Sequence, residues 1–450
     1  MSFFARAVAV TLFLSGSSVF LRAQTTEPPP RHITLEEAVQ VALKHNHVVR
    51  IAGLQVEEKQ HAKEFARSGY FPNVTNESRV FTVTDTQFID IPVGSLGTAA
   101  GSPIPARSAI LNQGGHTFVV SGTTLSQPLT QLFTRVKPSN EIAREDLKAT
   151  RANEQETVNE IALRVHQIYY QILVTQLHKR ATEAKIRAAQ DLESERVQQV
   201  KYGSTLNEQL IESRAQTLEA KQDLLTTELQ LSDLTMQLND VMGLPVTAAL
   251  DLDPSVPELQ EACPGEECVK IALASHPEIV AARAEVEKAS AAVRLARADY
   301  FPDISAFARQ SYQNNIPFLA RNFGTFGGQL TYNLFDGGRR RAAVRENSAR
   351  LAQARENLAR ITDEVERRVA TAANKLERTR EMVKVSEEIL TLRTEASRVS
   401  AQQFERGEAL RSQADASVAQ EFDAKSLLLR SQLDYVQARD EMIQAIGQTP

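Results

Sequence analysis

Residues 351–390 read LAQARENLAR ITDEVERRVA TAANKLERTR EMVKVSEEIL, and their spacing decides the fold. Apolar or small side chains recur about every 3.5 positions, which is the period of a coiled coil. The positions on this stripe are Leu351, Ala354, Leu358, Ile361, Val365, Val369, Ala372, Leu376, Thr379, Val383, Ser386 and Leu390. No proline or glycine interrupts residues 339–404, and at 1.5 Å per residue a helix over them would span roughly 100 Å. No compact domain needs such a length, so the stretch predicts one arm of an elongated structure.

One glycine interrupts each of two such helical spans. Neither span, 139–242 or 339–446, contains proline, and their only glycines are Gly203 and Gly407. We predict that Tyr202-Gly203-Ser204 and Arg406-Gly407-Glu408 are turns that reverse the chain, with each glycine in the left-handed conformation. The alternative is a helix that continues through the glycine at a cost of about 1 kcal/mol. Recurrence at the same point of both spans favours the turns.

The chain consists of two copies of one plan. Residues 38–75 align with 268–305 at an offset of 230, and Tyr70-Phe71-Pro72 recurs there as Tyr300-Phe301-Pro302. Residues 157–243 align with 361–447 at an offset of 204, so the first copy holds 26 extra residues. We place these in an enlarged Gly/Pro/Ser-rich loop at 93–107. The repeats are predicted to cover 33–250 and 268–450, joined by a linker at 251–267, with long helical hairpins at 138–243 and 339–447.

Between the entry helix and the long hairpin, each half switches to a period of two. Residues 325–334 place Phe326, Leu330 and Tyr332 on one face, and a similar alternation begins at Ile304. Weaker alternation around 81–91 and 117–126 completes four strands, arranged as two β-hairpins at about 74–128 and 303–335. Strands of about ten alternating residues are typical of a membrane barrel, although a soluble β-domain is the alternative. Four strands are too few to close a membrane barrel, so several chains would have to share one.

The N-terminus predicts export. Arg6 precedes an apolar stretch, which gives a signal peptide at 1–23, and a Pro-rich linker follows at 24–32. The alternative is a buried N-terminal helix. No later stretch approaches the roughly 18 apolar residues that a spanning helix needs. In an oxidising compartment, Cys263 and Cys268 are expected to form a small local disulfide, since a metal site needs more ligands than this pair offers.

Composition and motifs exclude several classes of function. The 450 residues carry 51 basic and 56 acidic side chains, a net charge of −5, without a Lys/Arg run typical of a nucleic-acid partner. We find no Gly-rich phosphate loop, no cluster of metal ligands and no Ser/His/Asp set. The sequence therefore predicts no cofactor, no metal and no catalytic residue, and the chain is not expected to be an enzyme.

With these features assembled, the sequence resembles the TolC-like outer-membrane efflux protein family (outer membrane factors) from about Ile33 to Gly447. The marks are the duplicated helix entry with Tyr-Phe-Pro, the glycine-centred turns, and the strand exit at 332–339, which contains Gly337 and Gly338. The equivalent exit in the first half, at 125–129, lacks the Gly-Gly pair. Each motif is weak alone, but their order occurs twice.

The resemblance implies a fold and a set of partners. It implies a homotrimer in which each chain gives four strands to a twelve-stranded barrel in outer-membrane lipid, while duplicated helical hairpins form an α-barrel in the periplasm. Such a trimer is the exit duct of a tripartite efflux pump or a type I secretion system, with a periplasmic adaptor and an inner-membrane transporter. The resemblance also implies that the turns at 202–204 and 406–408 close the pore and meet the adaptor.

One departure from the family concerns the gate. Some relatives carry acidic residues just before the second turn, whereas residues 397–403 here contain no carboxylate and one cation, Arg398. Arg398 is either a gate residue or an ordinary solvated helix residue. A different class of protein, a periplasmic coiled-coil adaptor or scaffold, is the alternative function, although adaptors usually have one helical hairpin rather than two equivalent halves.

Overall fold

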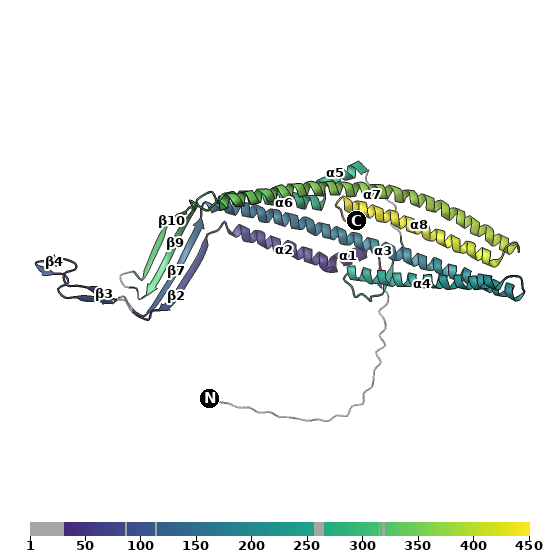
Figure 1. Ribbon diagram of the computed structural model, residues 1–450, viewed down its shortest axis with the longest axis horizontal. Coiled ribbons are helices and arrows are strands. Elements are labelled where there is room, and N and C mark those ends of the chain that lie inside the picture. Colours follow the sequence, from purple (N-terminus) through teal and green to yellow (C-terminus); the bar gives the residue numbers. More distant parts are fainter. Residues whose placement is uncertain (1–30, 86–87, 113–114, 256–264, 315, 317–319) are drawn as a thin grey trace, which may run out of the picture.

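The computed structural model describes residues 31–85, 88–112, 115–255, 265–314, 316 and 320–450. The expected signal peptide, most of the linker at 24–32, and Cys263 lie outside these residues. The described part is elongated, with a bundle of long helices at one end and a sheet at the other (Figure 1). Cys268 is buried, and its disulfide with Cys263 stays a prediction.

Eight α-helices form most of the described chain. In each repeat, a pair of short helices precedes the strands and a pair of long helices follows them. The helices are α1 Leu35–His45, α2 His47–Ser68, α3 Lys137–Lys201, α4 Asn207–Val241, α5 Gly265–Ser275, α6 Pro277–Ala298, α7 Arg339–Glu405 and α8 Arg411–Ala445. A single π-turn, η1 Leu132–Val136, runs directly into α3. The two long hairpins, α3–α4 and α7–α8, end at the same end of the molecule (Figure 1).

The strands within the described ranges form one main sheet and three small two-stranded ladders. The main sheet is antiparallel in the order β10-β9-β7-β2, with β2 Asn73–Thr82, β7 Thr117–Pro128, β9 Asp303–Asn314 and β10 Asn322–Thr331. The ladders pair β1 Arg31–Ile33 with β8 Leu250–Leu252, β3 Phe88–Ile91 with β6 Ala109–Asn112, and β4 Thr98–Ala99 with β5 Ser102–Pro103. The predicted fold class, mainly helical with four strands in two hairpins, is confirmed.

The prediction for the first strand is wrong. It was placed around 81–91, but β2 begins at Asn73, directly after Pro72. Polar side chains such as Asn76 and Ser78 share a face with Val74 and Val80, so the apolar alternation that would have marked the strand is weak. The extra residues lie between β2 and β7 as expected, but they form the paired arm β3–β6 and β4–β5 rather than a plain loop.

The seam predicted on α7 is correct. Every one of the twelve positions from Leu351 to Leu390 is buried or half-buried, and this side of α7 packs on α8 and α6. A second core lies where α3 meets α1, α4 and α8, around Tyr169, Leu238 and Leu433. Long helices held by such seams form a layer rather than a globule.

The order of helices across this layer decides which surfaces stay open. Between the middle and the helix tips the order is α4–α3–α8–α7, and between the middle and the sheet it is α2–α3–α6–α7. One side of the molecule therefore ends in β2, α2 and α4, and the other ends in β10 and α7 (Figure 1).

Candidate channel wall, junction and helix tip

The register of the main sheet separates its side chains into two faces. One face, which we call the uncharged face, contains no charged residue in any of the four strands. Its apolar members are Val74, Val80, Val119, Leu125, Ile304, Ala306, Ala308, Tyr312, Phe326 and Leu330. The opposite face carries the charged residues Glu77, Arg79, Asp303 and Arg309. An apolar face toward lipid and a polar face toward a lumen are typical of membrane-barrel strands.

The sheet meets the helices at a junction that both repeats build in the same way. Tyr70-Phe71-Pro72 follows α2, and Tyr300-Phe301-Pro302 follows α6. Proline cannot continue the helix and holds the chain extended into the strand. The four aromatic side chains are exposed in the single chain, at 41–66%.

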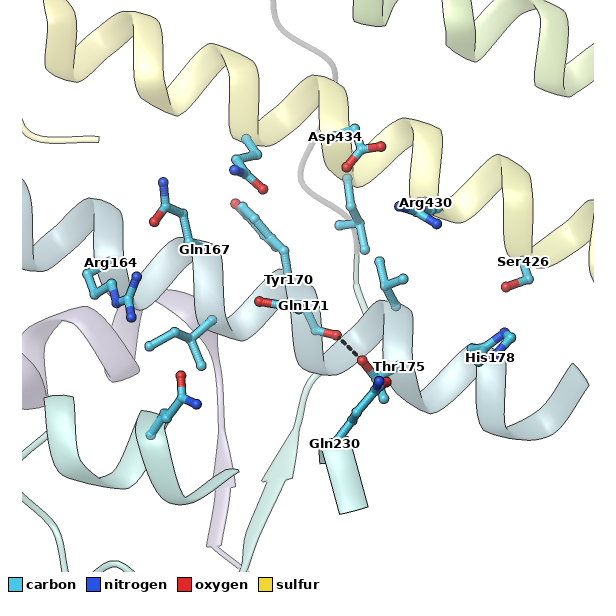
Figure 2. A pocket seen from close by; sticks show the side chains of 15 residues that line it. Arg164, Gln167, Tyr170, Gln171, Thr175, His178, Gln230, Ser426, Arg430 and Asp434 are labelled. Atoms are coloured by element: carbon cyan, nitrogen blue, oxygen red, sulfur yellow. Dashed lines mark hydrogen bonds between the residues drawn. The ribbon is translucent and has the colours of Figure 1, made fainter. Parts of the chain in front are cut away.

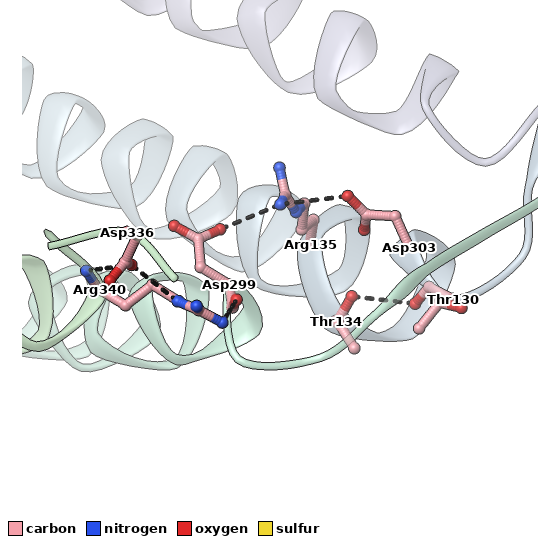
Figure 3. Close-up of polar contacts among 7 residues, drawn as sticks. All are labelled: Thr130, Thr134, Arg135, Asp299, Asp303, Asp336 and Arg340. Carbon is pink, nitrogen blue, oxygen red and sulfur yellow. Dashed lines mark hydrogen bonds and ion pairs between the residues drawn. The ribbon is translucent and has the colours of Figure 1, made fainter. Parts of the chain in front are cut away.

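Arg340 closes the second strand exit. Its guanidinium lies over the rings of Tyr300 and Tyr332, at 5.5 and 5.6 Å from their centroids, and its Nε donates to Asp336 Oδ2 at 2.8 Å (Figure 3). The same carboxylate accepts from the backbone N–H of Arg340 and Gly338. The hydrogen bond from the Arg340 guanidinium, followed by these backbone hydrogen bonds, lowers the pKa of Asp336. Gly337 and Gly338, at φ +64° and +89°, supply the left-handed backbone that this tight exit needs.

Arg135 provides the matching contact on the other side of the junction. Its Nη2 lies 3.0 Å from Asp299 Oδ1 and 3.5 Å from Asp303 Oδ2 (Figure 3). The π-turn before α3 is thereby tied to the end of α6 and the start of β9, so the two repeats are fixed to each other where the sheet begins.

The two predicted turns lie together at the far end of the helices, which we call the tip. Gly203 and Gly407 have φ of +70° and +75°. Ser204 N donates to Gln199 O and Glu408 N donates to Gln403 O, both at 2.9 Å, which is the six-to-one bond of a Schellman motif. Tyr202 is 77% exposed. The turns are therefore as predicted, whereas their role in docking stays a prediction.

Polar contacts hold the two long hairpins together near the tip. Glu195 Oε1, near the end of α3, accepts from Ser412 N at the start of α8 at 3.0 Å. Lys185 Nζ lies 3.1 Å from Asp423 Oδ1. These contacts join the first hairpin to the second within one chain.

Arg398 is exposed near the tip and binds its own helix. Its guanidinium donates to Glu395 at 2.6 and 2.9 Å, which lowers the pKa of Glu395 and raises that of Arg398. The pair presents no net charge, and in the single chain Arg398 contacts no other hairpin. Its role as a gate stays a prediction.

An acidic pair behind the tip was not found from the sequence. Asp415 on α8 faces Asp191 on α3, and burial together with a hydrogen bond to Asp191 raises the pKa of Asp415. Arg411 lies 3.5 Å from the same carboxyl. The two aspartates are 224 positions apart, so no local pattern could have paired them.

A polar cleft of about 640 Å³ opens between α3, α4 and α8 near the middle of the layer (Figure 2). Glutamines and charged side chains dominate its wall, which includes Arg164, Gln167, Gln171, His178, Arg430 and Asp434. Beside it, the Asp440 carboxylate is fully buried and accepts from His166 Nδ1 at 2.6 Å and from Tyr170 OH at 3.3 Å. This network fixes α8 against α3 next to a surface that water can fill.

The described residues contain one group with the composition of a metal site, Glu156, His276 and Glu278, whose ligand atoms lie within 4.8 Å of one another. The geometry does not suit a cation. His276 Nδ1 accepts from Glu278 N at 3.2 Å, so the proton sits on Nε2 and no ring lone pair is free. Glu278 is already bound by Arg368 Nη2 at 2.6 Å. The group is a buried polar cluster in which burial raises the pKa of Glu156 to about 7.

The sequence carried one signal for these buried polar residues. Glu156 and His166 lie at the packing positions of α3, between small residues such as Ala152 and Ala162 that are buried. A charged or imidazole side chain in a seam is unusual, although the partner that satisfies it cannot be predicted from one chain.

Comparison with known proteins agrees with the channel geometry. The family model described as outer membrane efflux protein matches residues 268–448, which is the second repeat. Residues 268–448 belong to that family. No curated protein sequence gives a match.

Solved structures cover both repeats. The CmeC outer membrane channel of Campylobacter jejuni superimposes with a TM-score of 0.75 at 14% identity, over 92% of this chain and 85% of that one. VceC, an outer membrane protein of Vibrio cholerae, gives 0.72 at 14% identity over 92% and 96%. A membrane protein from Pseudomonas aeruginosa gives 0.73 at 19% identity over 92% and 93%. Over 92% of its length, the chain therefore has the fold of these membrane proteins.

The resemblance to the outer-membrane efflux proteins is thus confirmed. The family match and the shared fold support an efflux duct of the outer membrane with its helices extending into the periplasm. The matched family is one of channels and not of enzymes, which confirms the non-enzymatic interpretation and disfavours the adaptor alternative. Among the described residues, no helix combines the length and apolar character needed to cross a bilayer.

Proposed function

We propose that three copies of the chain form one continuous duct, with a twelve-stranded barrel in the outer membrane and an α-barrel in the periplasm. We further propose that this duct is the exit of a tripartite efflux pump or type I secretion system, opened at its tip by an adaptor and supplied by an inner-membrane transporter. The observation that carries the assembly is a correspondence between the contact of the two repeats within one chain and the surfaces that the chain leaves open.

The exposed edge of α4 supports this correspondence. Apolar side chains that are 44–67% exposed recur along it at steps of seven, seven, four and seven residues: Ile211, Leu218, Leu225, Leu229 and Met236. The repeat offset of 204 places Leu229 on Leu433 and Met236 on Asp440. Both α8 residues are buried in the contact with α3. At these two positions, α4 leaves open what α8 buries within the chain.

The exposed edge of α7 is the surface that would pack against α4 of the next copy. Val385, Leu392 and Val399 recur every seven residues and are 39–65% exposed. By the same offset, Val399 corresponds to Glu195, which contacts α8. The seam between α3 and α8 within a chain is thus a template for a seam between α7 of one copy and α4 of the next. The free strands β10 and β2 would pair by the same rule, antiparallel as β7 pairs with β9.

Cross-linking tests the assembly. His166 contacts Asp440 within the chain, and the offset converts this pair into Ala370 and Met236 across two copies. We expect Ala370→Cys/Met236→Cys to give a ladder that ends at three chains with a short bis-maleimide. Ala370→Cys/Gln216→Cys, which uses the opposite side of α4, and the unsubstituted chain are the controls. A ladder that ends at two, continues past three, or is equally strong in the controls contradicts the proposal.

Conductance tests the gate. Because Glu195 and Lys185 tie the two tips together, opening requires these contacts to separate. We expect Glu195→Ala/Lys185→Gln to raise the open-state current of the trimer in planar bilayers at least severalfold. Lys221→Gln, an exposed substitution on α4 outside these contacts, should leave it unchanged. Equal currents in all three proteins would contradict a closed tip held by this seam.

A further inference from the structure

A small groove lies at the junction of sheet and helices, between the start of α3 and the end of α6. It encloses about 290 Å³ and is lined by Phe133, Thr134, Lys137, Pro138, Glu141, Arg294, Ala298 and Phe301. Phe133 and Phe301 are 78% and 58% exposed. The groove thus combines two open aromatic rings with Lys137 and the Arg294–Glu141 ion pair.

In the trimer proposed above, a neighbouring copy leaves this groove uncovered. At this level the helix order is α2–α3–α6–α7, so α3 and α6 are the two middle helices. Copies that associate through the edges β2, α2, β10 and α7 meet on either side of the groove and leave it open. Exposed phenylalanines at a site that no subunit covers call for another apolar partner.

The surroundings of the groove are cationic. We define the junction as residues 65–72, 129–141, 294–303 and 332–346, which contain nine Lys/Arg and five Asp/Glu. The chain as a whole has a net charge of −5, so positive charge is concentrated here.

Each of the five acidic residues of the junction contacts an arginine: Glu141 contacts Arg294, Asp299 and Asp303 share Arg135, Asp336 contacts Arg340, and Glu346 contacts Arg350. Six cations have no ion-pair partner in the part of the chain that the structure describes: Arg67, Lys137, Arg297, Arg339, Arg341 and Arg345. Lys137 is the member of this set that lines the groove.

We propose that this groove binds an anionic phospholipid of the periplasmic leaflet of the outer membrane. The uncharged face of the sheet lies in the bilayer and ends at the junction, so the groove lies at the level of the headgroups on the periplasmic side. Lys137 holds the phosphate, and the rings of Phe133 and Phe301 cover the first part of the acyl chains. Aromatic side chains beside cationic ones are suited to that boundary. The cationic groups bind the anionic headgroup, and the aromatic rings contact the apolar acyl chains.

Lipid binding to the purified full-length protein in a non-ionic detergent tests the proposal. Phosphatidylglycerol is titrated against phosphatidylcholine, with bound lipid per chain counted by native mass spectrometry. We expect phosphatidylglycerol to bind more tightly, and Lys137→Gln to weaken it about fivefold, as expected for one cationic side chain at an anionic headgroup. Lys221→Gln on the distant part of α4 makes the same change of charge and should have no effect.

Two further experiments distinguish a phospholipid from free phosphate, and the contribution of the headgroup from that of the acyl chains. Inorganic phosphate at millimolar concentration should not displace the lipid; displacement would show a simple anion site and overturn the lipid assignment. Phe133→Ser/Phe301→Ser should weaken both lipids while keeping the preference for phosphatidylglycerol. Equal binding of the two lipids by the unsubstituted protein, or unchanged binding by Lys137→Gln with intact secondary structure, would also overturn it. Because this readout does not require conductance or an adaptor, it can fail while the proposed function stands.

Discussion

The carboxyl of Glu156 offers a test of how the C-terminal turn is fixed to the layer. Glu156 is buried between α3, α6 and the end of α8, where its Oε1 accepts from Gln444 Nε2 at 3.2 Å while Oε2 has no partner among the described residues. Burial is the main cause of its raised pKa, and the negative charge of Glu278 adds to it. We consider Glu156→Gln, which keeps the shape and the acceptor but cannot ionise.

The sign and the size of the effect follow from linkage. The pKa of Glu156 rises from 4.5 to about 7 on folding, so the folded state holds the proton more tightly than the unfolded state. Its contribution is most favourable below pH 4.5, is lost as the pH rises toward 7, and stays lost above that. A shift of about 2.5 pKa units corresponds to about 3 kcal/mol. Glu156→Gln should therefore be about 2–3 kcal/mol more stable than the unsubstituted protein at pH 8.5 and nearly equal to it at pH 4.5.

Thermal unfolding in detergent, followed by circular dichroism at several values of pH, measures the difference. For a chain of this length we expect about 1–2 °C per kcal/mol, because the unfolding entropy scales with size. Glu377→Gln is the control, since Glu377 is exposed on α7 and is not among the charges that shift the pKa of Glu156. A gap between Glu156→Gln and the unsubstituted protein that is constant across the pH range, or that grows toward low pH, would refute the assignment of a raised pKa.

Three further outcomes are expected. Gly447→Ala should lower the unfolding midpoint more than Gly203→Ala, because a Cβ on Gly447 would meet His276 Cα at 2.8 Å, whereas one on Gly203 meets nothing within 4 Å; equal shifts would contradict the packing of the C-terminal turn on α6. Gly203→Ala itself should cost only about 1–2 kcal/mol, the strain of the left-handed backbone, measured in the same melts. Asp336→Asn should make the exit of β10 more sensitive to limited proteolysis, since it loses the charged contact to Arg340 Nε at 2.8 Å. That contact lowers the pKa of Asp336, so the unsubstituted protein should lose its advantage as the pH falls below about 4.

The features that the sequence predicted are those that depend on local spacing. The stripe from Leu351 to Leu390 was found because a seam repeats with every turn of helix, and the turn at Gly203 was found because glycine is needed where the backbone is left-handed. The strand β2 was misplaced because its local spacing gives only a weak signal. Its two faces differ in charge but hardly in apolar content. The alternation between the faces is therefore weak in the sequence, and it becomes visible only when β2 is paired with β7.

The features that the sequence could not give depend on pairs of distant residues. His166 and Asp440 are 274 positions apart, and either alone is an ordinary polar residue on a helix. The groove of Phe133 and Phe301 is formed by both repeats. The two phenylalanines do not occupy equivalent positions, because Phe133 lies in the π-turn before α3 and Phe301 follows α6. Repeat symmetry therefore predicts the elements of each repeat, but not which side chains of the two repeats meet within the chain.

The repeats also differ in a way that decides where the duct can open. Within a chain, the seam of α3 and α8 near the tip is polar, with Glu195 bound to Ser412 N and Lys185 to Asp423. At an offset of 204, the corresponding positions between copies are Val399 with Glu208, and Ile389 with Glu219. Hydrogen-bonded and ionic contacts can exchange with water at small net cost, whereas exposing the apolar stripes of α7 and α4 would cost about 25 cal/mol for each Å². If the copies associate as proposed, the seams within each chain are therefore the ones that separate when the tip opens, and the seams between copies hold the tube together.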